Sequence, residues 1–168
     1  MKIKKNTFVS RAAVGCVTTA IFLLLCIIKG IYPFGIATLD TVDFQSQWIP
    51  AYYHVWDVLH GDGSAFFDWR VGGGNNFAGV SAQFSLFSPF NLFFLFVKRS
   101  WIEKSMIVFL LIKLLAMGYG MRWFLKEQIL KEERYGIYIL AGSVGYAVNG
   151  YTLLYYGMGW LDVAAILP

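Results

Sequence analysis

The chain has 168 residues, of which 58% are apolar and only 14% are charged. An average soluble domain has about 45–50% apolar and about 25% charged residues, so this composition disfavours a soluble globule and favours a bilayer as solvent. The net charge of +4 comes partly from the basic start, residues 1–11. In a membrane protein such a start fixes orientation, and no nucleic-acid partner is predicted.

The first membrane helix is expected over residues 12–31. An uncharged run lies between Arg11 and Lys29, and a helix needs about 17–25 apolar residues to cross a bilayer. A cleavable signal peptide is the alternative, but no small-residue cleavage site follows the run, so we predict an uncleaved anchor. Cys16 and Cys26 lie within the run without the spacing of metal ligands or of a disulfide framework.

Residues 32–104 are expected to form a long outer loop with short membrane-associated segments. Apolar residues recur at helical spacing from Trp48 to Leu59, which predicts a helix that lies along the membrane interface. The run from Phe84 to Val97 is apolar but is interrupted by serine, proline and asparagine. Because runs of about 10–14 residues are more often interfacial or re-entrant than spanning, we interpret it as a dipping segment.

Two further spanning helices are expected over residues 105–121 and 135–159. The first carries Lys113 at its centre, where a lysine costs about 2.5–3.5 kcal/mol on insertion scales, so its side chain should face protein or water. The second has no charged residue, and its small residues recur at helical spacing, which lets another helix approach closely. Residues 160–168 resemble an outer turn and the start of a truncated next helix.

The basic residues predict which loops are cytoplasmic. If the run 84–97 does not span, the N-terminus and the loop of residues 122–134 together carry eight lysines and arginines, against five on the outer side. If it spans, the division is seven to six. Cytoplasmic loops collect basic residues, so we favour the first arrangement. It predicts an all-α, multi-pass plasma-membrane protein with about three spanning helices and a cytoplasmic N-terminus.

The aspartates that follow the first helix are the leading catalytic candidates. Asp40 and Asp43 would lie near the outer membrane surface, within reach of the sugar of a lipid-borne phosphate. A carboxylate in that position suits a general base that acts on an acceptor hydroxyl. The alternative is that both aspartates are solvated loop residues or helix caps, which composition alone favours.

Three other residues could contact a substrate. Arg70 precedes a glycine-rich turn, residues 72–76, whose backbone amides could bind an anion beside the guanidinium; the alternative is an ordinary turn, because the ending of a P-loop is absent. Lys113 could neutralise a phosphate or form a structural ion pair. Asp162 would lie on the same outer side as the aspartate loop. The two histidines predict no metal site; no cofactor is predicted, and a divalent metal stays open.

A set of short motifs runs through the chain in a specific order. They are Asp43 with Gln47-Trp48-Ile49-Pro50, Gly61, Asp68-Trp69, Gly72–Asn76, Ser88-Pro89-Phe90-Asn91, Ile112-Lys113, Tyr146-Ala147-Val148-Asn149-Gly150, and Trp160-Leu161-Asp162 through Pro168. In this order the chain resembles the N-terminal part of the YfhO family of bacterial membrane proteins. That family looks like the multi-spanning glycosyltransferases of the GT-C architecture, in which the first outer loop carries a catalytic acid.

The resemblance implies transfer of a sugar from a polyprenyl-phosphate donor to a cell-envelope acceptor such as lipoteichoic acid. Carried over by position, Asp43 becomes the general base or acceptor-orienting residue, Asp40 its alternative and Gln47 a polar partner. Arg70 and Lys113 become phosphate contacts. Members of the family continue through many more helices, so the implied partners include membrane lipids and the remaining helices of a longer chain.

Two alternatives to a glycosyltransferase stay open. A transporter or flippase component would use Lys113 and the glycine-rich helix of residues 135–161 for substrate passage, and would work without Asp43. A truncated, inactive fragment would insert into the membrane but lack the helices that complete a donor cavity.

Overall fold

The computed structural model describes residues 3–37, 44–80, 87–130, 136–155, 162 and 165. Its helices are α1 (Ile3–Ile28), η1 (Phe44–Trp48), α2 (Ile49–Leu59), α3 (Phe77–Val80), η3 (Pro89–Phe96), η4 (Arg99–Trp101), α4 (Ile102–Phe124), η5 (Leu125–Ile129), α5 (Gly136–Ala147) and α6 (Gly150–Tyr155). The only strands within the described residues are β1 (Phe67–Asp68) and β2 (Asn75–Asn76), which pair antiparallel. The predicted all-α fold is therefore confirmed.

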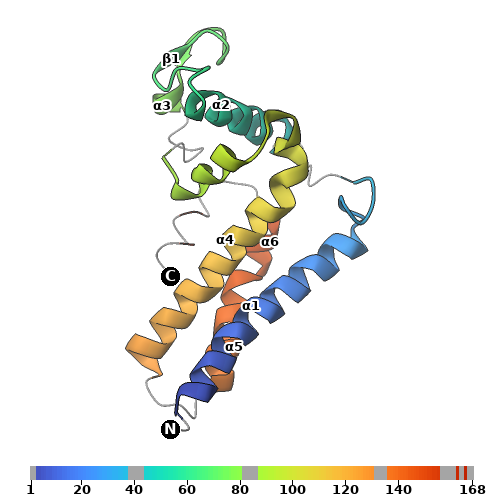
Figure 1. Ribbon diagram of the computed structural model, residues 1–168, viewed down its shortest axis with the longest axis vertical. Helices are drawn as coiled ribbons and strands as arrows, with labels where there is room; N and C mark the ends of the chain where they lie inside the picture. Colours follow the sequence, from blue (N-terminus) through green and yellow to red (C-terminus); the bar gives the residue numbers. More distant parts are fainter. Residues whose placement is uncertain are drawn as a thin grey trace.

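Three helical stretches are long and apolar enough to cross a membrane. They are Arg11–Ile28, Arg99–Ile129 and Gly136–Tyr155. Figure 1 shows α1 rising from the N-terminus, α4 running back towards that end, and α5 with α6 rising again. The three stretches pack against one another. The prediction of three membrane-spanning helices is confirmed, and the protein is a membrane protein.

The end of α1 is set by a glycine that directs the chain into the outer loop. Gly30 has a φ of 61°, a left-handed conformation that glycine adopts without steric cost. Its amide donates to the carbonyl of Ile27 at 3.0 Å, and the amide of Ile31 donates to that of Cys26 at 2.9 Å. These two bonds form a Schellman motif, which satisfies the last carbonyls of the helix.

Small residues allow the three membrane helices to approach closely. A Cβ added at Gly118 of α4 would lie 3.3 Å from Val14 of α1 and 3.6 Å from Ala147 of α5. Ser143, one turn before Ala147, is also fully buried, and its hydroxyl donates to the carbonyl of Ile139 at 2.6 Å. The expected close packing through small residues is therefore present on one face of α5.

An aromatic core fixes the outer loop on the end of α4. The ring centroid of Tyr52 on α2 lies 5.2 Å from that of Phe94 on η3 and 5.3 Å from that of Phe109 on α4. In addition, the Trp56 indole donates to the carbonyl of Val97 at 2.7 Å. Figure 1 shows α2 lying across the end of α4. The helix predicted from Trp48 to Leu59 thus corresponds to α2, with a face buried against protein.

The described part of the predicted dipping segment is the 3-10 helix η3. Its eight residues begin after Ser88, whose side-chain oxygen accepts a hydrogen bond from the Phe90 amide at 3.2 Å. A 3-10 helix rises about 2 Å per residue, so η3 extends about 16 Å, roughly half of the bilayer core. By itself η3 is too short to cross a membrane, whereas the start of the predicted segment, residues 84–86, lies outside the described residues.

Candidate functional site

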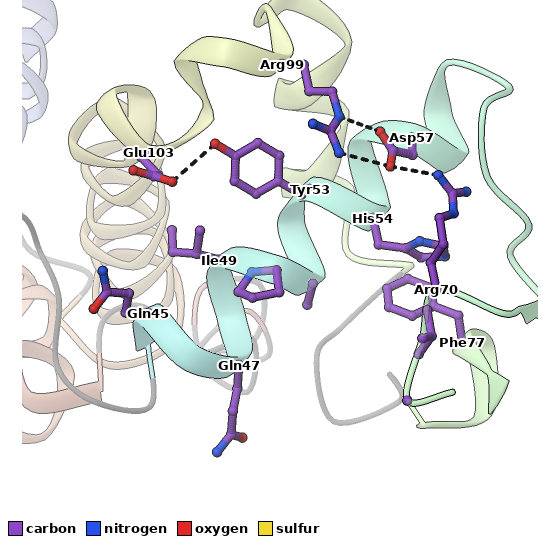
Figure 2. Close-up of a pocket in the computed structure, with 14 residues that line it drawn as sticks. Gln45, Gln47, Ile49, Tyr53, His54, Asp57, Arg70, Phe77, Arg99 and Glu103 are labelled. Atoms are coloured by element: carbon purple, nitrogen blue, oxygen red, sulfur yellow. Dashed lines mark hydrogen bonds and ion pairs between the residues drawn. The ribbon is translucent and has the colours of Figure 1, made fainter. Parts of the chain in front are cut away.

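A cavity of about 720 Å³ lies where η1, α2, the β1–β2 hairpin and the first turn of α4 meet. Small-molecule sites typically enclose about 300–1,000 Å³, so this cavity could hold a sugar-sized group. Figure 2 shows its walls, which combine apolar side chains with charges of both signs. The polar and charged groups that matter for its chemistry are Gln45, Gln47, Asp57, Arg70, Arg99 and Glu103.

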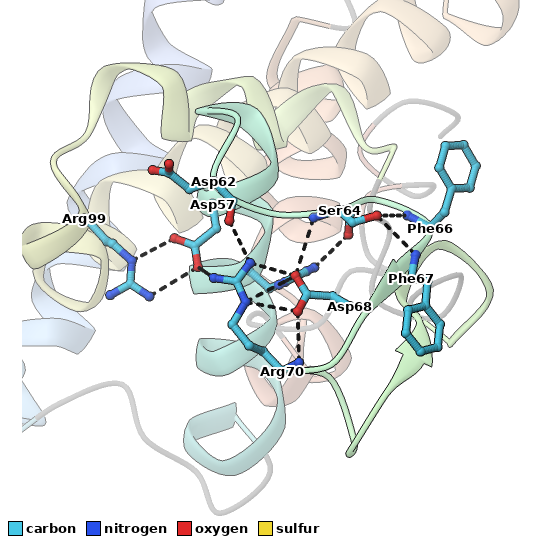
Figure 3. Close-up of polar contacts among 9 residues, drawn as sticks. Asp57, Asp62, Ser64, Phe66, Phe67, Asp68, Arg70 and Arg99 are labelled. Atoms are coloured by element: carbon cyan, nitrogen blue, oxygen red, sulfur yellow. Dashed lines mark hydrogen bonds and ion pairs between the residues drawn. The ribbon is translucent and has the colours of Figure 1, made fainter.

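Asp57 on α2 is a buried carboxylate held between two arginines. It is only 6% exposed. Arg99, which begins η4, donates from Nε to Oδ1 at 2.8 Å and from Nη2 to Oδ2 at 3.3 Å. Arg70 of the hairpin donates from Nη1 to Oδ2 at 3.4 Å. Figure 3 shows that Asp57 thereby joins α2, the hairpin and η4, and its negative charge is already neutralised.

Arg70 is engaged mainly by Asp68, two residues earlier. Its Nε donates to Oδ1 at 3.0 Å and its Nη2 to Oδ2 at 2.7 Å, which is a two-pronged ion pair. The backbone amide of Arg70 also donates to Oδ1 at 2.9 Å. These bonds to Arg70 hold the pKa of Asp68 well below its usual range. The predicted phosphate contact at Arg70 would therefore have to share the guanidinium with Asp68.

The glycine-rich turn joins β1 to β2. Gly72, Gly73 and Gly74 have φ values of 57°, 78° and 107°, which side chains rarely adopt. The amide of Gly74 donates to the carbonyl of Val71 at 3.0 Å, so this amide serves the turn itself. Gly72 reaches the wall of the cavity, and it is the part of the predicted anion-binding turn that a ligand in the cavity would meet.

His54 on α2 packs against the β1–β2 hairpin and the segment that precedes it. Its Nε2 lies 3.1 Å from the carbonyl of Ser64, and because a carbonyl only accepts, Nε2 carries the proton. Nδ1 lies 3.9 Å from Oδ2 of Asp68. The imidazole packs edge-on against the Phe77 ring, with 4.1 Å between the two ring centroids. The residue is only 7% exposed. Among the described residues no group of histidine, cysteine and acidic side chains could hold a metal ion.

Glu103, in the first turn of α4, provides a second carboxylate in the cavity. The hydroxyl of Tyr53 donates to its Oε1 at 3.2 Å, as Figure 2 shows. Burial and the nearby Glu103 raise the pKa of Tyr53, so the hydroxyl stays protonated and donates at neutral pH. The guanidinium of Arg99 lies over the Tyr53 ring, 4.9 Å from its centroid. Glu103 forms no ion pair with any described residue.

The structure brings some of the predicted site residues to this cavity. Gln47 and Arg70 line it. Asp40 and Asp43, the predicted catalytic residues, lie outside the described residues. Gln45, which follows Asp43 by two positions, also lines the cavity.

Lys113 and Asp162 form a separate pair within the helix bundle. The Nζ atom of Lys113 lies 2.6 Å from Oδ1 of Asp162, and both side chains are buried. Nζ also lies 4.5 Å from the centroid of the Phe109 ring. Neither residue lines the outer cavity. The expectation that Lys113 faces protein is confirmed, and its charge is neutralised by a carboxylate from beyond α6.

Sequence analysis missed several groups that shape the cavity. Asp57 is separated from Arg99 by 42 positions, and Tyr53 from Glu103 by 50. No spacing rule connects residues so far apart. The one signal available was the placement of Arg99 and Glu103 at the start of a membrane helix, where charged residues commonly mark the interface.

Comparison with known proteins identifies the family. The family model described as bacterial membrane protein YfhO matches residues 15–168. No curated protein and no solved structure matches the chain. The match covers nearly the whole chain, and the order of motifs found in the sequence is in accord with it. The chain therefore belongs to the YfhO family of bacterial membrane proteins.

Proposed function

We propose that this protein acts in a membrane glycosyltransferase of the GT-C type. It transfers a sugar from a polyprenyl-phosphate donor to a cell-envelope acceptor such as lipoteichoic acid. The donor chain lies in the membrane, and the acceptor reaches the cavity from outside. This assignment goes beyond family membership and depends on the chemistry that the cavity can perform.

The observation that carries the proposal is the polar cavity at the end of the membrane helices. Gln45 and Gln47 line it, and Gln45 follows Asp43 by two residues, a stretch of chain that reaches at most about 7 Å. Glu103 adds a carboxylate that no described cation neutralises. A cavity of this kind, at the level where a lipid headgroup lies, suits a reaction between a membrane-bound donor and a polar acceptor.

The proposed reaction is a single displacement at the anomeric carbon of the sugar. The acceptor oxygen forms a bond to that carbon, and the bond from the carbon to the phosphate oxygen breaks with its electron pair leaving on the phosphate. Asp43 takes the proton of the acceptor hydroxyl, and the configuration at the carbon is inverted. Asp40 is the alternative base, and Gln47 orients the acceptor through its amide.

The proposed orientation places the N-terminus in the cytoplasm and the cavity outside. The start of α1 and the end of α4 lie at the same end of the three helices (Figure 1). The sequence is rich in lysine and arginine at both places, residues 1–11 and 122–134, and cytoplasmic segments collect these residues. In this orientation residues 32–104 face the cell envelope, where an acceptor polymer is found. A Ser64→Cys variant tests this orientation: a thiol reagent that does not cross the membrane should label it when added to intact cells.

A transporter or flippase component is the second candidate. The buried pair of Lys113 and Asp162 favours it, because ionisable residues inside a membrane often line a substrate pathway. The two functions differ in what they require. Transport would survive the loss of Asp43 and depend on Lys113, whereas sugar transfer would depend on Asp43.

Sugar incorporation into envelope polymer tests the proposal. The protein is expressed in bacterial cells that lack the endogenous transfer activity, and labelled sugar in the purified polymer is measured. Incorporation above that of cells with an empty vector supports a glycosyltransferase. If the labelled lipid-linked sugar instead changes sides of the membrane without reaching polymer, the transporter is favoured.

A further inference from the structure

A second, smaller cavity lies beside the first, at the level where α1 ends and α4 begins. It encloses about 320 Å³, near the lower limit of about 300 Å³ for small-molecule sites. Its walls are mostly apolar, and the aliphatic and phenylalanine side chains in them are Ile31, Ile36, Phe44, Ile49, Met106 and Ile107. A cavity of this size and character suits the head and first carbons of a lipid.

Lys104 is the one cation that the described part of the chain contributes to the wall of this second cavity. Among the described residues it forms no ion pair with a carboxylate. Its Nζ lies 5.7 Å from the ring centroid of Tyr32 and 5.3 Å from that of Trp101. Tyrosine, tryptophan and lysine together are typical of the membrane–water interface. Lys104 therefore offers an uncompensated positive charge where a lipid phosphate would lie.

The other basic residues expected to contact phosphate are already paired. Arg70 donates hydrogen bonds from Nε and Nη2 to the two carboxylate oxygens of Asp68. Lys113 is paired with Asp162 at 2.6 Å and lines neither cavity. Of these three cations, Lys104 alone forms no ion pair with a carboxylate of the described residues. A phosphate contact in the first turn of α4 would therefore not compete with an ion pair among the described residues, unlike a contact at Arg70 or Lys113.

The two cavities share a wall. Ile49 of α2 and Glu103 of α4 line both of them. Lys104, the next residue along α4, lines only the smaller cavity, and Arg70 lines only the larger. A phosphate held by Lys104 would therefore lie on one side of Glu103, with the polar cavity on the other side.

We propose that the smaller cavity binds the phosphate and the first isoprenoid carbons of the lipid carrier, with Lys104 as the phosphate contact. This inference rests on the proposed function. The sugar attached to the phosphate extends past Glu103 into the larger cavity, where the acceptor attacks its anomeric carbon. The phosphate that leaves with the bonding electrons stays beside Lys104, whose charge stabilises it.

Direct binding of farnesyl phosphate, a short isoprenoid phosphate, tests this site without any sugar transfer. The full chain is placed in phosphatidylcholine nanodiscs and titrated with the probe. The test variant is Lys104→Ala, and the matched control is Lys98→Ala, an exposed lysine six positions earlier that lines neither cavity. We expect Lys104→Ala to weaken binding about tenfold, the effect of one charge-assisted hydrogen bond. Lys98→Ala and Lys104→Arg should bind like the parent.

Two further arms identify the ligand. Farnesol, which lacks the phosphate, should bind at least about tenfold more weakly to the parent protein, and the difference should shrink in Lys104→Ala. Phosphatidylglycerol in excess should not displace the probe; displacement by this bulk anionic lipid would overturn the assignment to an isoprenoid carrier. Equal binding by the parent and Lys104→Ala would overturn the site itself. If farnesyl phosphate binds in a way that depends on Lys104 but cells show no sugar incorporation, the lipid-phosphate site is supported and the proposed sugar transfer is rejected.

Discussion

The side chain of Arg99 donates from Nε to Oδ1 of Asp57 at 2.8 Å and joins η4, the short helix that leads into α4, to α2. The outer loop returns to the membrane helices at this contact. Asp57 is buried, whereas the side chain of Arg99 is 52% exposed. The contact therefore joins a carboxylate that is almost completely desolvated to a guanidinium that remains partly hydrated.

Replacement of Asp57 by asparagine should loosen the outer loop. The change removes the charge that balances Arg99 and Arg70, and hydrogen bonds to charged groups contribute about 1.5–3 kcal/mol. Because both arginines are half exposed, we expect a loss near the lower limit, about 1–2 kcal/mol. The melting temperature in detergent measures it. Asp62→Asn, an exposed carboxylate in the same loop, is the control, and an equal effect of both changes would contradict this role.

The ion pair between Asp68 and Arg70 should make the hairpin sensitive to acid. Hydrogen bonds from Arg70 lower the pKa of Asp68 in the folded protein. A carboxyl group of this kind adds stability above its unfolded pKa, about 3.9, and that contribution is lost as the pH falls through the folded value. We expect Asp68→Asn to lower the melting temperature at neutral pH and to flatten its decline below about pH 4.

The acid profile of the parent protein provides the comparison for Asp68→Asn. Melting temperatures are measured from neutral pH down to about pH 3, below the unfolded pKa of about 3.9, where the stabilising contribution of Asp68 begins to fall because the unfolded carboxyl takes up a proton. Asp62→Asn again serves as the control variant. Acid profiles of the parent and Asp68→Asn that superimpose would show that this ion pair does not contribute to stability.

The membrane helices could be predicted because their signal is local. Long apolar runs identified three spanning stretches, and the helical spacing of apolar residues from Trp48 to Leu59 identified α2. Each signal depends only on neighbouring residues and on the thickness of a bilayer. The packing of α2 onto α4 could not be predicted, because the contact of Tyr52 with Phe109 joins residues far apart in the chain.

The cavity was less predictable than the fold. Sequence analysis identified Gln47 and Arg70, which line it, but took Arg70 as free to bind phosphate. The neighbouring Asp68 occupies its guanidinium, and the two residues could pair because the turn brings position i+2 back towards position i. Lys104 was counted only as a basic residue on the outer side, and neither it nor Glu103 was identified as a cavity residue, because charged residues at a helix start are common for reasons of interface and helix dipole alone.

The buried pair of Lys113 and Asp162 should behave as one unit. Replacement of Lys113 by methionine leaves a buried carboxylate without its counter-charge, and replacement of Asp162 by leucine leaves the ammonium unpaired. Breaking a buried ion pair costs about 3–5 kcal/mol, whereas replacing both partners by apolar residues is often close to neutral. We therefore expect the double variant to be more stable than either single variant.

Melting temperatures of the four proteins complete the double-mutant cycle for this pair. Additive losses would contradict the coupling. Sugar incorporation measured on the same variants separates the candidate functions further. A double variant that is stable and retains transfer would show that Lys113 is a structural residue, whereas a stable double variant without substrate movement would favour a transport pathway.

The role of Asp43 is the central claim of the proposed function. Loss of a general base typically slows a reaction by about 10²–10⁴-fold. We expect Asp43→Asn to lower the rate of sugar transfer to envelope polymer by at least about 100-fold, with protein levels in the membrane unchanged. Asp40→Asn tests the neighbouring carboxylate, and Asp62→Asn is the control for loss of a loop charge.

The most direct measurement is the initial rate of sugar transfer from a polyprenyl-phosphate donor to acceptor polymer in membranes that contain the parent protein or Asp43→Asn. The account predicts transfer by the parent, transfer by Asp62→Asn at the same rate, and a rate near background for Asp43→Asn. Transfer by Asp43→Asn at the parental rate would contradict the assignment of Asp43 as the base. Absence of transfer by the parent itself would contradict the glycosyltransferase.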